Sequence, residues 1–260
     1  MTTSRSSYAI LVLLVLVTYI LVTRGNPRLG KKPLGRVLGS ENAVIRDYPY
    51  MVSIEKLGHF AGSGAILNSR YVLTTASRAH SAQTLELSIR AGTSLRGQGG
   101  FVHQVDKIVL HEKYNLTDGA TARPTSFDVA VVRVAEPFNF DEECQPARLF
   151  NQSEGAPSGV EARLTGWGDP GTGELSLQMQ VARLAVLERG SCGSELSDGQ
   201  FCAGGPGRQL CRGDEGGPLA LGSRLVGMAA WGFGCAGSTL PAVFTEIAHY
   251  RDWIDEHAKF

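Results

Sequence analysis

The 260-residue chain lacks net charge, because 25 Lys and Arg balance 25 Asp and Glu, and it lacks cysteine before residue 144. It also lacks an uninterrupted apolar segment of the roughly 20 residues that span a bilayer. Its apolar fraction of 43% is ordinary for a folded domain, which excludes a disordered or fibrous chain. The length suits one large domain or two small ones.

The balanced charge conceals an asymmetry between the N-terminal segment and the rest of the chain. Residues 1–36 carry six Lys or Arg and no Asp or Glu, which leaves 19 basic against 25 acidic side chains in the remainder. A body this acidic has no general electrostatic attraction to DNA or RNA. We therefore expect no nucleic-acid partner.

An uncharged apolar run, Tyr8–Val22, follows Arg5 near the start of the chain. It is too short to span a bilayer and lies where the apolar region of a secretory signal peptide belongs. We expect residues 1–25 to be a signal peptide and the protein to be secreted, without a stable membrane anchor. An uncleaved signal anchor is the alternative, although the excess of positive charge after the run is the wrong bias for it.

Two further features suit a secretory route. The sequons Asn115-Leu-Thr and Asn151-Gln-Ser would be glycosylated only in that compartment. All five cysteines lie in the second half of the chain, and this number suits an oxidising destination with two disulfides and one thiol left over. They are Cys144, Cys192, Cys202, Cys211 and Cys235.

The rest of the chain divides into recognisable segments. Residues 26–36 are rich in Gly, Pro and basic side chains and indicate an exposed, cleavable pro-segment. From residue 49, short β-branched runs alternate with turn residues, which is typical of an all-β sandwich or barrel. The acidic, proline-containing stretch 136–159 separates two sets of these runs. Tyr250, Trp253, Ile254 and His257 have helical spacing and predict a final amphipathic helix packed on the second set.

An ordered series of motifs then identifies a resemblance. Six motifs follow one another along the chain: "GSGAILNSRYVLTTA", "SFDVAVVRV", "LTGWG", "GQFCAG", "CRGDEGGPL" and "AAWGFGCAG". This order is that of the chymotrypsin-fold, trypsin-like serine proteases, which the chain resembles from Val37 to Phe260. The resemblance implies two six-stranded antiparallel β-barrels, at about 37–140 and 150–246, and a C-terminal helix over 247–260. It implies an active site in the crevice between the barrels, and we expect no cofactor and no metal ion.

The residues at the family's catalytic triad positions are degenerate. "VLTTASR" places Ser77 where the family has its histidine, and Glu215 stands in place of the nucleophilic serine, while Asp128 keeps the third position. An acyl enzyme requires an activated hydroxyl or thiol beside a base. Attack by a carboxylate on an amide would give a high-energy anhydride. We therefore expect no peptidase activity.

Substitutions around the triad support this alignment without a gap. Arg78 and Ala61 replace the two halves of one family disulfide, so both halves are lost together. Ala230 replaces the serine that usually hydrogen-bonds the triad aspartate. The backbone N–H groups of Gly213 and Glu215 would form the oxyanion hole, and we expect the Glu215 carboxylate to occupy it as a charge-assisted acceptor.

Two enzymatic alternatives remain open. In the first, "RAHSA" is shifted by three residues and His80 serves as the base, although such a slip is costly in a strand whose register is fixed. In the second, Glu215 and Asp128 form an acid pair for glycoside cleavage, although nothing else in the sequence builds a sugar site.

The resemblance also assigns the specificity pocket. Gln209 stands where trypsin has the aspartate that binds Arg or Lys, and Ala242 replaces a wall glycine. A neutral amide removes the charge pairing that selects cations. Trp231 and Gly232 match the substrate-binding edge, so a peptide could be held there without being cut.

The activation apparatus and two disulfides are retained by resemblance. In the family, cleavage after the residue equivalent to Arg36 frees the amine of the next residue, here Val37, which pairs with the aspartate at Asp214. A buried carboxylate without its cation is costly, so the three together suggest a zymogen that is still cleaved. The family disulfides correspond to Cys192–Cys202 and Cys211–Cys235.

These observations favour a secreted serine protease homologue without activity that acts by binding a protein partner, as a cofactor, decoy or regulator of a proteolytic cascade. The cysteine at 144 matches one that elsewhere tethers the pro-segment, yet residues 1–36 contain no cysteine. Cys144 is then either a free thiol or part of an intermolecular disulfide.

Overall fold

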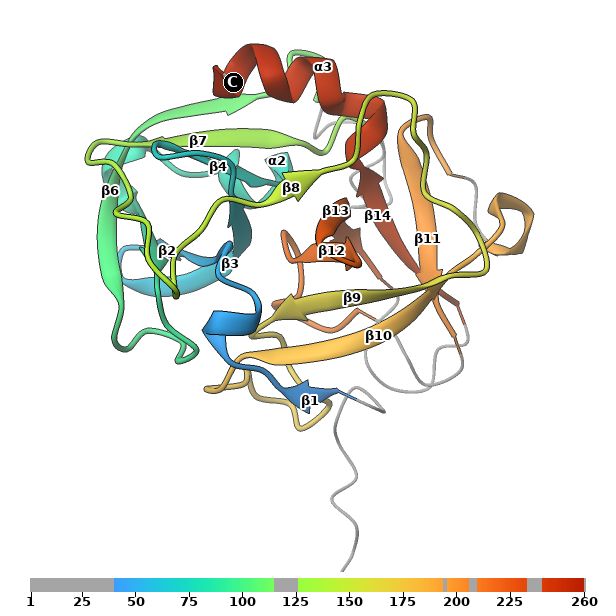
Figure 1. Cartoon of the computed structure of the whole chain (residues 1–260), viewed down its shortest axis with the longest axis horizontal. Coiled ribbons are helices and arrows are strands. Elements are labelled where there is room, and N and C mark those ends of the chain that lie inside the picture. The colour runs from blue at the N-terminus through green and yellow to red at the C-terminus, as the bar shows by residue number, and fades with distance from the viewer. Residues whose placement is uncertain (1–39, 115–125, 194–195, 206–209, 233–239, 260) are drawn as a thin grey trace, which may run out of the picture. The chain divides into compact units, whose positions relative to one another are not determined.

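The computed structural model describes residues 40–114, 126–193, 196–205, 210–232 and 240–259. The chain divides into two units after Leu34, and all described residues belong to the second, which ends at Phe260. Within it, strands form two barrels, drawn in blue to green and in yellow to orange in Figure 1.

The first barrel is closed by six antiparallel strands in the order β2-β3-β4-β7-β6-β5. Leu57 and Gly58, with φ values of 51° and 79°, make the two-residue turn between its first two strands, a geometry that matches the twist of a hairpin. The side chains that face inward, such as Val52, Ile54 and Ile89, are fully buried. The strands are β2 (Met51–Lys56), β3 (His59–Ile66), β4 (Tyr71–Thr74), β5 (Leu87–Ala91), β6 (Phe101–Leu110) and β7 (Ala130–Val134).

The second barrel contains six further antiparallel strands, and the pairing of its first two closes it. These are β9 (Glu161–Gly166), β10 (Gln180–Val186), β11 (Gln200–Gly204), β12 (Pro218–Leu221), β13 (Arg224–Trp231) and β14 (Ala242–Glu246). Two short strands that the sequence pattern did not indicate extend it: β1 (Glu41–Asn42) pairs with β10, and β8 (Arg148–Leu149) pairs in parallel with β13. The predicted pair of six-stranded barrels is confirmed.

Short helical turns connect the strands and a longer helix ends the chain. They are η1 (Ile45–Asp47), α2 (Ala76–Ala79), η2 (Thr84–Glu86), η3 (Arg189–Ser191) and α3 (Ile247–Ala258). Within the described parts of the chain, no helix has both the length and the hydropathy to cross a membrane.

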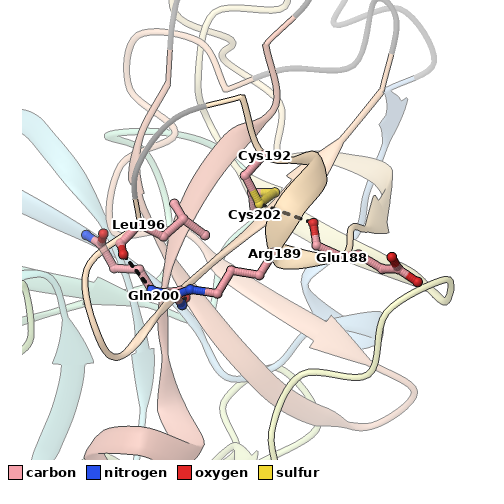
Figure 2. The surroundings of a disulfide bond; sticks show 6 residues. All are labelled: Glu188, Arg189, Cys192, Leu196, Gln200 and Cys202. Carbon is pink, nitrogen blue, oxygen red and sulfur yellow. Dashed lines mark hydrogen bonds between the residues drawn. A yellow bond between two sulfur atoms is a disulfide. The ribbon is translucent and has the colours of Figure 1, made fainter.

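The described cysteines are distributed over both barrels. Cys192 and Cys202 form the predicted disulfide, which joins η3 to β11 in the second barrel (Figure 2). Cys211 is disulfide-bonded, and its predicted partner Cys235 lies outside the described residues. Cys144 is a free thiol, 5% exposed in the first-barrel core, and burial raises its pKa to about 11. An intermolecular disulfide from Cys144 stays a prediction, and it would require this segment to open.

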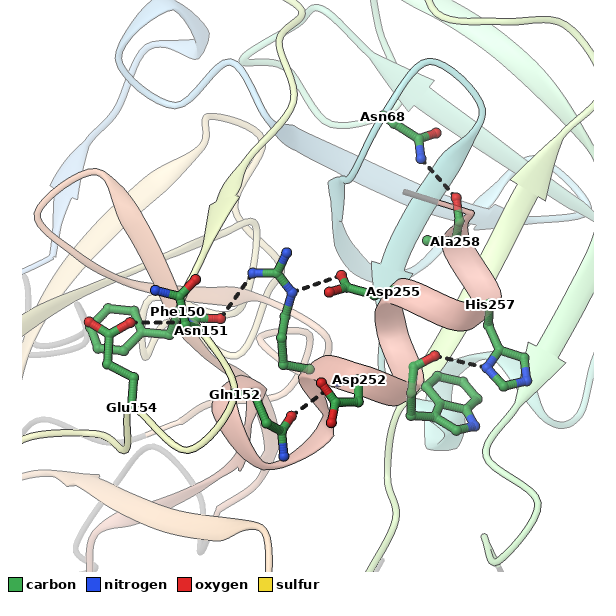
Figure 3. Close-up of polar contacts among 11 residues, drawn as sticks. Asn68, Phe150, Asn151, Gln152, Glu154, Asp252, Asp255, His257 and Ala258 are labelled. Atoms are coloured by element: carbon green, nitrogen blue, oxygen red, sulfur yellow. Dashed lines mark hydrogen bonds and ion pairs between the residues drawn. The ribbon is translucent and has the colours of Figure 1, made fainter.

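The C-terminal helix corrects one expectation. It ends at Ala258, and its buried face contacts both barrels rather than the second alone, because Tyr250 and Ile254 pack with Leu73 of β4 as well as with Met228 of β13. Figure 3 shows the polar contacts along it, including the bond from Asn68 Nδ2 to the Ala258 carbonyl at 2.9 Å.

The rest of this helix surface is also engaged by both barrels. Arg251 Nη1 donates to the Phe150 carbonyl at 3.2 Å, on the second-barrel side. Trp253 packs against the same buried cluster, as the sequence pattern predicts, and it also stacks on His257 with ring centroids 4.4 Å apart and on His111 at 5.1 Å. The helix therefore ties the two barrels together.

Candidate functional site

The first-barrel half of the site lies where β4 leads into α2. The backbone N–H of Ser77 donates to Asp128 Oδ1 at 2.6 Å, and its hydroxyl donates to Asp128 Oδ2 at 2.9 Å. Asp128 comes directly before the segment that enters β7, after Phe127 at a φ of 58°. Ser77 therefore faces Asp128, as the alignment without a gap predicts, and both carboxylate oxygens are bound.

Asp128 is almost completely removed from solvent, with 1% exposed. Burial raises the pKa of its carboxyl to about 6, against the opposing effect of the two hydrogen bonds from Ser77 and the positive charge of Arg78. Its backbone carbonyl accepts a hydrogen bond from Thr245 Oγ1 of β14 at 2.9 Å. The aspartate thus serves as a structural acceptor at the junction of the barrels.

His80 lies at the end of α2 and turns to the backbone. Its Nδ1 lies 3.0 Å from the Ser77 carbonyl and 3.3 Å from the Ala76 carbonyl, and its ring packs near Tyr114 with centroids 6.0 Å apart. Since Ser77 already binds both oxygens of Asp128, this arrangement does not orient His80 as a base.

The second-barrel half contains Glu215. Its Oε2 accepts the backbone N–H of Gly213 at 2.8 Å, which is the hydrogen bond predicted for the Gly213 side of the oxyanion hole. Gly213 has a φ of 91°, and a Cβ there would lie 2.5 Å from Leu175 Cδ2, so only glycine fits. The Glu215 carbonyl in turn accepts the N–H of Ser63 from β3 at 3.2 Å.

Asp214 precedes Glu215 and is 8% exposed. Its Oδ2 accepts the N–H of Cys211 at 2.8 Å, and a Cβ on Gly168 would lie 2.0 Å from its Oδ1. Burial raises the pKa of Asp214 to about 7, and the negative charges of Glu215 and Asp169 add to this rise, against the lowering effect of the backbone hydrogen bond from Cys211. This is the condition expected of the activation aspartate before its amine partner arrives.

A small cavity adjoins this carboxyl. Its volume is about 20 Å³, which is room for about one water molecule, and Ser40 lines it together with Asp214 and Gly168. Ser40, the first described residue, therefore lies against the same cavity as the Asp214 carboxyl.

Only part of the expected specificity pocket lies in the described residues. There, Leu210 is 3% exposed and packs close to Gly232, where a Cβ would lie 2.8 Å from Leu210 Cβ. Ala242 is buried and Trp231 is half-buried. Our sequence reasoning missed Leu210, and a bulky apolar side chain beside Gln209 was the signal available.

Of the two predicted glycosylation sites, Asn151 is described. It is exposed, as a glycosylation site requires, and its N–H donates to Glu154 Oε2 at 2.9 Å. The predicted positions outside the described residues are Arg36, Val37, Asn115, Gln209 and Cys235.

Comparison with known proteins gives consistent relatives. The trypsin family matches residues 37–254. Trypsin epsilon of Drosophila erecta is 33% identical over 235 residues, which cover 86% of this chain and 88% of that protein. Trypsin Blo t 3 of Blomia tropicalis is 31% identical over 233 residues, which cover 85% of each.

Two solved structures have the same fold. The scabies mite inactivated protease paralogue S-D1 has a TM-score of 0.75 and 25% identity, covering 85% of this chain and 97% of that one. Mouse neuropsin, a serine protease, has a TM-score of 0.75 and 24% identity, covering 84% and 98%.

Proposed function

The chain belongs to the trypsin family of serine proteases, and from this premise we propose that it is a secreted, non-catalytic member that acts by binding other proteins. Its sequence relatives are named trypsins, so the proposed loss of activity does not follow from family membership. It rests on the residues at the catalytic positions.

One observation carries the proposal: the carboxylate of Glu215 stands at the nucleophile position and is bound to the Gly213 N–H at 2.8 Å. A carboxylate in that position forms no acyl enzyme, and it also occupies a donor that would stabilise the oxyanion of a transition state. Nucleophile and part of the oxyanion hole are therefore lost through one residue.

The first-barrel half supports the same conclusion. A serine hydroxyl is a poor base at neutral pH. The Ser77 hydroxyl donates a hydrogen bond to Asp128 and is not positioned to take a proton from a nucleophile. His80 bonds to backbone carbonyls. For the glycosidase alternative, Asp128 is 1% exposed, which leaves it no access to a sugar.

The close approach of Leu210 to Gly232 further supports a binding role, because it narrows the space between two segments that flank a substrate side chain in the family. We infer that the scaffold acts as a cofactor, decoy or regulator of a proteolytic cascade. A structurally similar protein from the scabies mite is itself named an inactivated protease paralogue, so loss of activity on this fold has a named precedent.

Secretion and processing complete the proposal. Residues 1–25 act as a signal peptide, residues 26–36 as a pro-segment, and residues 37–260 as the protease-like domain, with glycans on Asn115 and Asn151. Cleavage after Arg36 gives Val37 an amine that pairs with the buried Asp214, which forms no ion pair with a cationic side chain of the described residues.

The test is turnover of peptide esters and thioesters by purified protein cut after Arg36, with N-terminal sequencing to show that Val37 is the first residue. The expected rate equals that of a Glu215→Ala control at every substrate. Hydrolysis above that control would overturn the proposed loss of activity, and secreted protein that begins near residue 26 and resists trypsin at Arg36 would overturn the processing step.

A further inference from the structure

Arg78 lies inside the degenerate site, directly after Ser77 in α2. Its aliphatic stem lies against β3, where a Cβ on Gly62 would be 2.9 Å from Arg78 Cδ. The same Cβ would lie 3.2 Å from the backbone oxygen of Glu215. Arg78 is therefore adjacent both to the residue at the histidine position and to the segment at the nucleophile position.

The guanidinium of Arg78 has no partner in the described residues. Its Nε is buried and makes no hydrogen bond, and no carboxylate of the described chain lies within ion-pair distance. Other arginines are paired: Arg90 with Glu55 at 2.6 Å and Arg133 with Asp106 at 2.7 Å. A buried donor left without an acceptor is destabilising, and more so when it is charged, so Arg78 is held in a position that favours an incoming acceptor.

A second unpartnered donor lies in the same electrostatic neighbourhood. Tyr114 Oη is buried without a hydrogen bond, and burial together with the charge of Asp128 raises the pKa of Tyr114 to about 12, so it keeps its proton. The charge of Arg78 acts on both Tyr114 and Asp128. Neither Arg78 Nε nor Tyr114 Oη is bound to Asp128, whose two oxygens accept hydrogen bonds from Ser77.

We propose that Arg78 is the recognition residue for the side-chain carboxylate of an Asp or Glu in a protein partner that lies over the degenerate site. A guanidinium presents a planar fork that matches a carboxylate. Asp128 and Glu215 lie close by and repel a dianion such as phosphate more strongly than a monoanion. The inference rests on the proposed binding function and names the chemistry of the bound group.

The experiment observes the Arg78 Nε–H signal by NMR in the full protein with ¹⁵N-labelled arginine. The probes are two end-blocked peptides, acetyl-Gly-Gly-Glu-Gly-Gly-amide and its Gln counterpart, with acetyl-pentaglycine bearing a free C-terminus as a third arm. Only the Glu peptide is expected to shift the signal. Equal shifts with Glu and Gln would overturn the proposal, as would a shift with the free C-terminus alone.

Variants sharpen the assignment. Both substitutions at position 78 remove the observed signal, so binding of the Glu peptide is compared by calorimetric titration. Arg78→Gln should weaken it about 10- to 100-fold, the loss of a charge-assisted interaction, and Arg78→Lys several-fold, because it keeps the charge without the fork. The matched control is Arg148→Gln, an exposed arginine on β8, which should change binding less than about twofold, as expected for a screened surface charge. An equal loss in the control would mean general charge attraction and would overturn the proposal. Peptide-ester turnover does not involve Arg78, so detecting it would refute inactivity alone.

Discussion

The two halves of the degenerate site differ in how the replacing side chain is held. In the first barrel, Ser77 is shorter than the histidine it replaces, and its N–H and hydroxyl bind both oxygens of a buried aspartate, Asp128. In the second barrel, Glu215 is longer than the serine it replaces and folds back on the N–H of Gly213, where it is only half-buried. Ser77 therefore belongs to a buried hydrogen-bond network at the junction of the barrels, whereas Glu215 binds a half-buried N–H group that water would otherwise reach.

The covalent support follows the same division. The disulfide of Cys192 and Cys202 lies in the second barrel, and Cys211 is also disulfide-bonded there. The first barrel holds a buried free thiol and relies on its apolar core and on α3. Because Asp128 is buried at the junction of the barrels, its substitution should lower the stability of the whole fold. Substitution of Glu215 should alter only the local site.

The largest expected effect comes from restoring both halves at once. Ser77→His with Glu215→Ser should react with a serine-directed fluorophosphonate about 10²- to 10⁴-fold faster than Glu215→Ser alone, because that is the usual contribution of a general base. Rates from pseudo-first-order labelling give the comparison. Additive effects of the two changes would mean that the halves do not act as a unit.

The next effect is on stability and belongs to the first half. Asp128→Ala leaves the N–H of Ser77 without an acceptor in a buried site and removes the shorter of the two hydrogen bonds of its hydroxyl, which should lower the free energy of unfolding by about 2–3 kcal/mol. Urea unfolding measures it. Ser77→Ala is the control and should cost about 1 kcal/mol, since only the hydroxyl bonds are lost and the N–H of residue 77 keeps its acceptor. An Asp128→Ala variant as stable as wild type would remove the structural role of the first half.

A third effect distinguishes Asp214 from its neighbour Glu215. The pKa of Asp214 is raised from 3.8 to about 7 on folding, so its stabilising contribution is complete below pH 3.8 and is lost as the pH rises to about 7. In the uncut protein, Asp214→Asn should be more stable than wild type by about 1–3 kcal/mol at pH 7. The gap should vanish at pH 4.

Cleavage after Arg36 should reverse this order, because the Val37 amine then compensates the Asp214 charge. Thermal unfolding of both proteins, cut and uncut, over pH 4–8 makes the measurement. Parallel curves for wild type and variant across that range would contradict the raised pKa of Asp214.

The smallest effect is expected at Glu215. Glu215→Ala should change the free energy of unfolding by less than about 1 kcal/mol, because Gly213 is half-buried and its N–H can bind water instead. Glu215→Gln keeps an acceptor and should match wild type. Amide hydrogen exchange at Gly213 should speed up in the Ala variant and stay unchanged in the Gln variant. A loss as large as that of Asp128→Ala would erase the difference between the halves.

Much of the fold and of the site follows from the sequence, because main-chain positions travel with ordered motifs. The β-branched runs and their turns predict only an all-β sandwich or barrel. The resemblance to the trypsin-like proteases implies the two barrels, and the motifs "VLTTASR" and "GDEGGP" then predict that Ser77 meets Asp128 and Glu215 meets Gly213.

What the sequence could not predict depends on packing between distant segments. Two examples are the close approach of Leu210 to Gly232 and the contacts of α3 with both barrels, which join residues far apart in the chain. A third is the unpartnered Nε of Arg78, because only the folded structure shows which acceptors lie near it. Helical spacing predicted an apolar face on α3, but it could not say which barrel would cover that face, and here both do.

The central claim is that neither half of the site can make an activated nucleophile. The most direct measurement is intact-mass analysis of the wild-type protein, cut after Arg36, after long exposure to a serine-directed fluorophosphonate, with Ser77→His/Glu215→Ser run in parallel. The account predicts no added mass on wild type and one phosphonyl group on the double variant. A phosphonyl group on any residue of the wild-type cleft, Ser77 included, would contradict it.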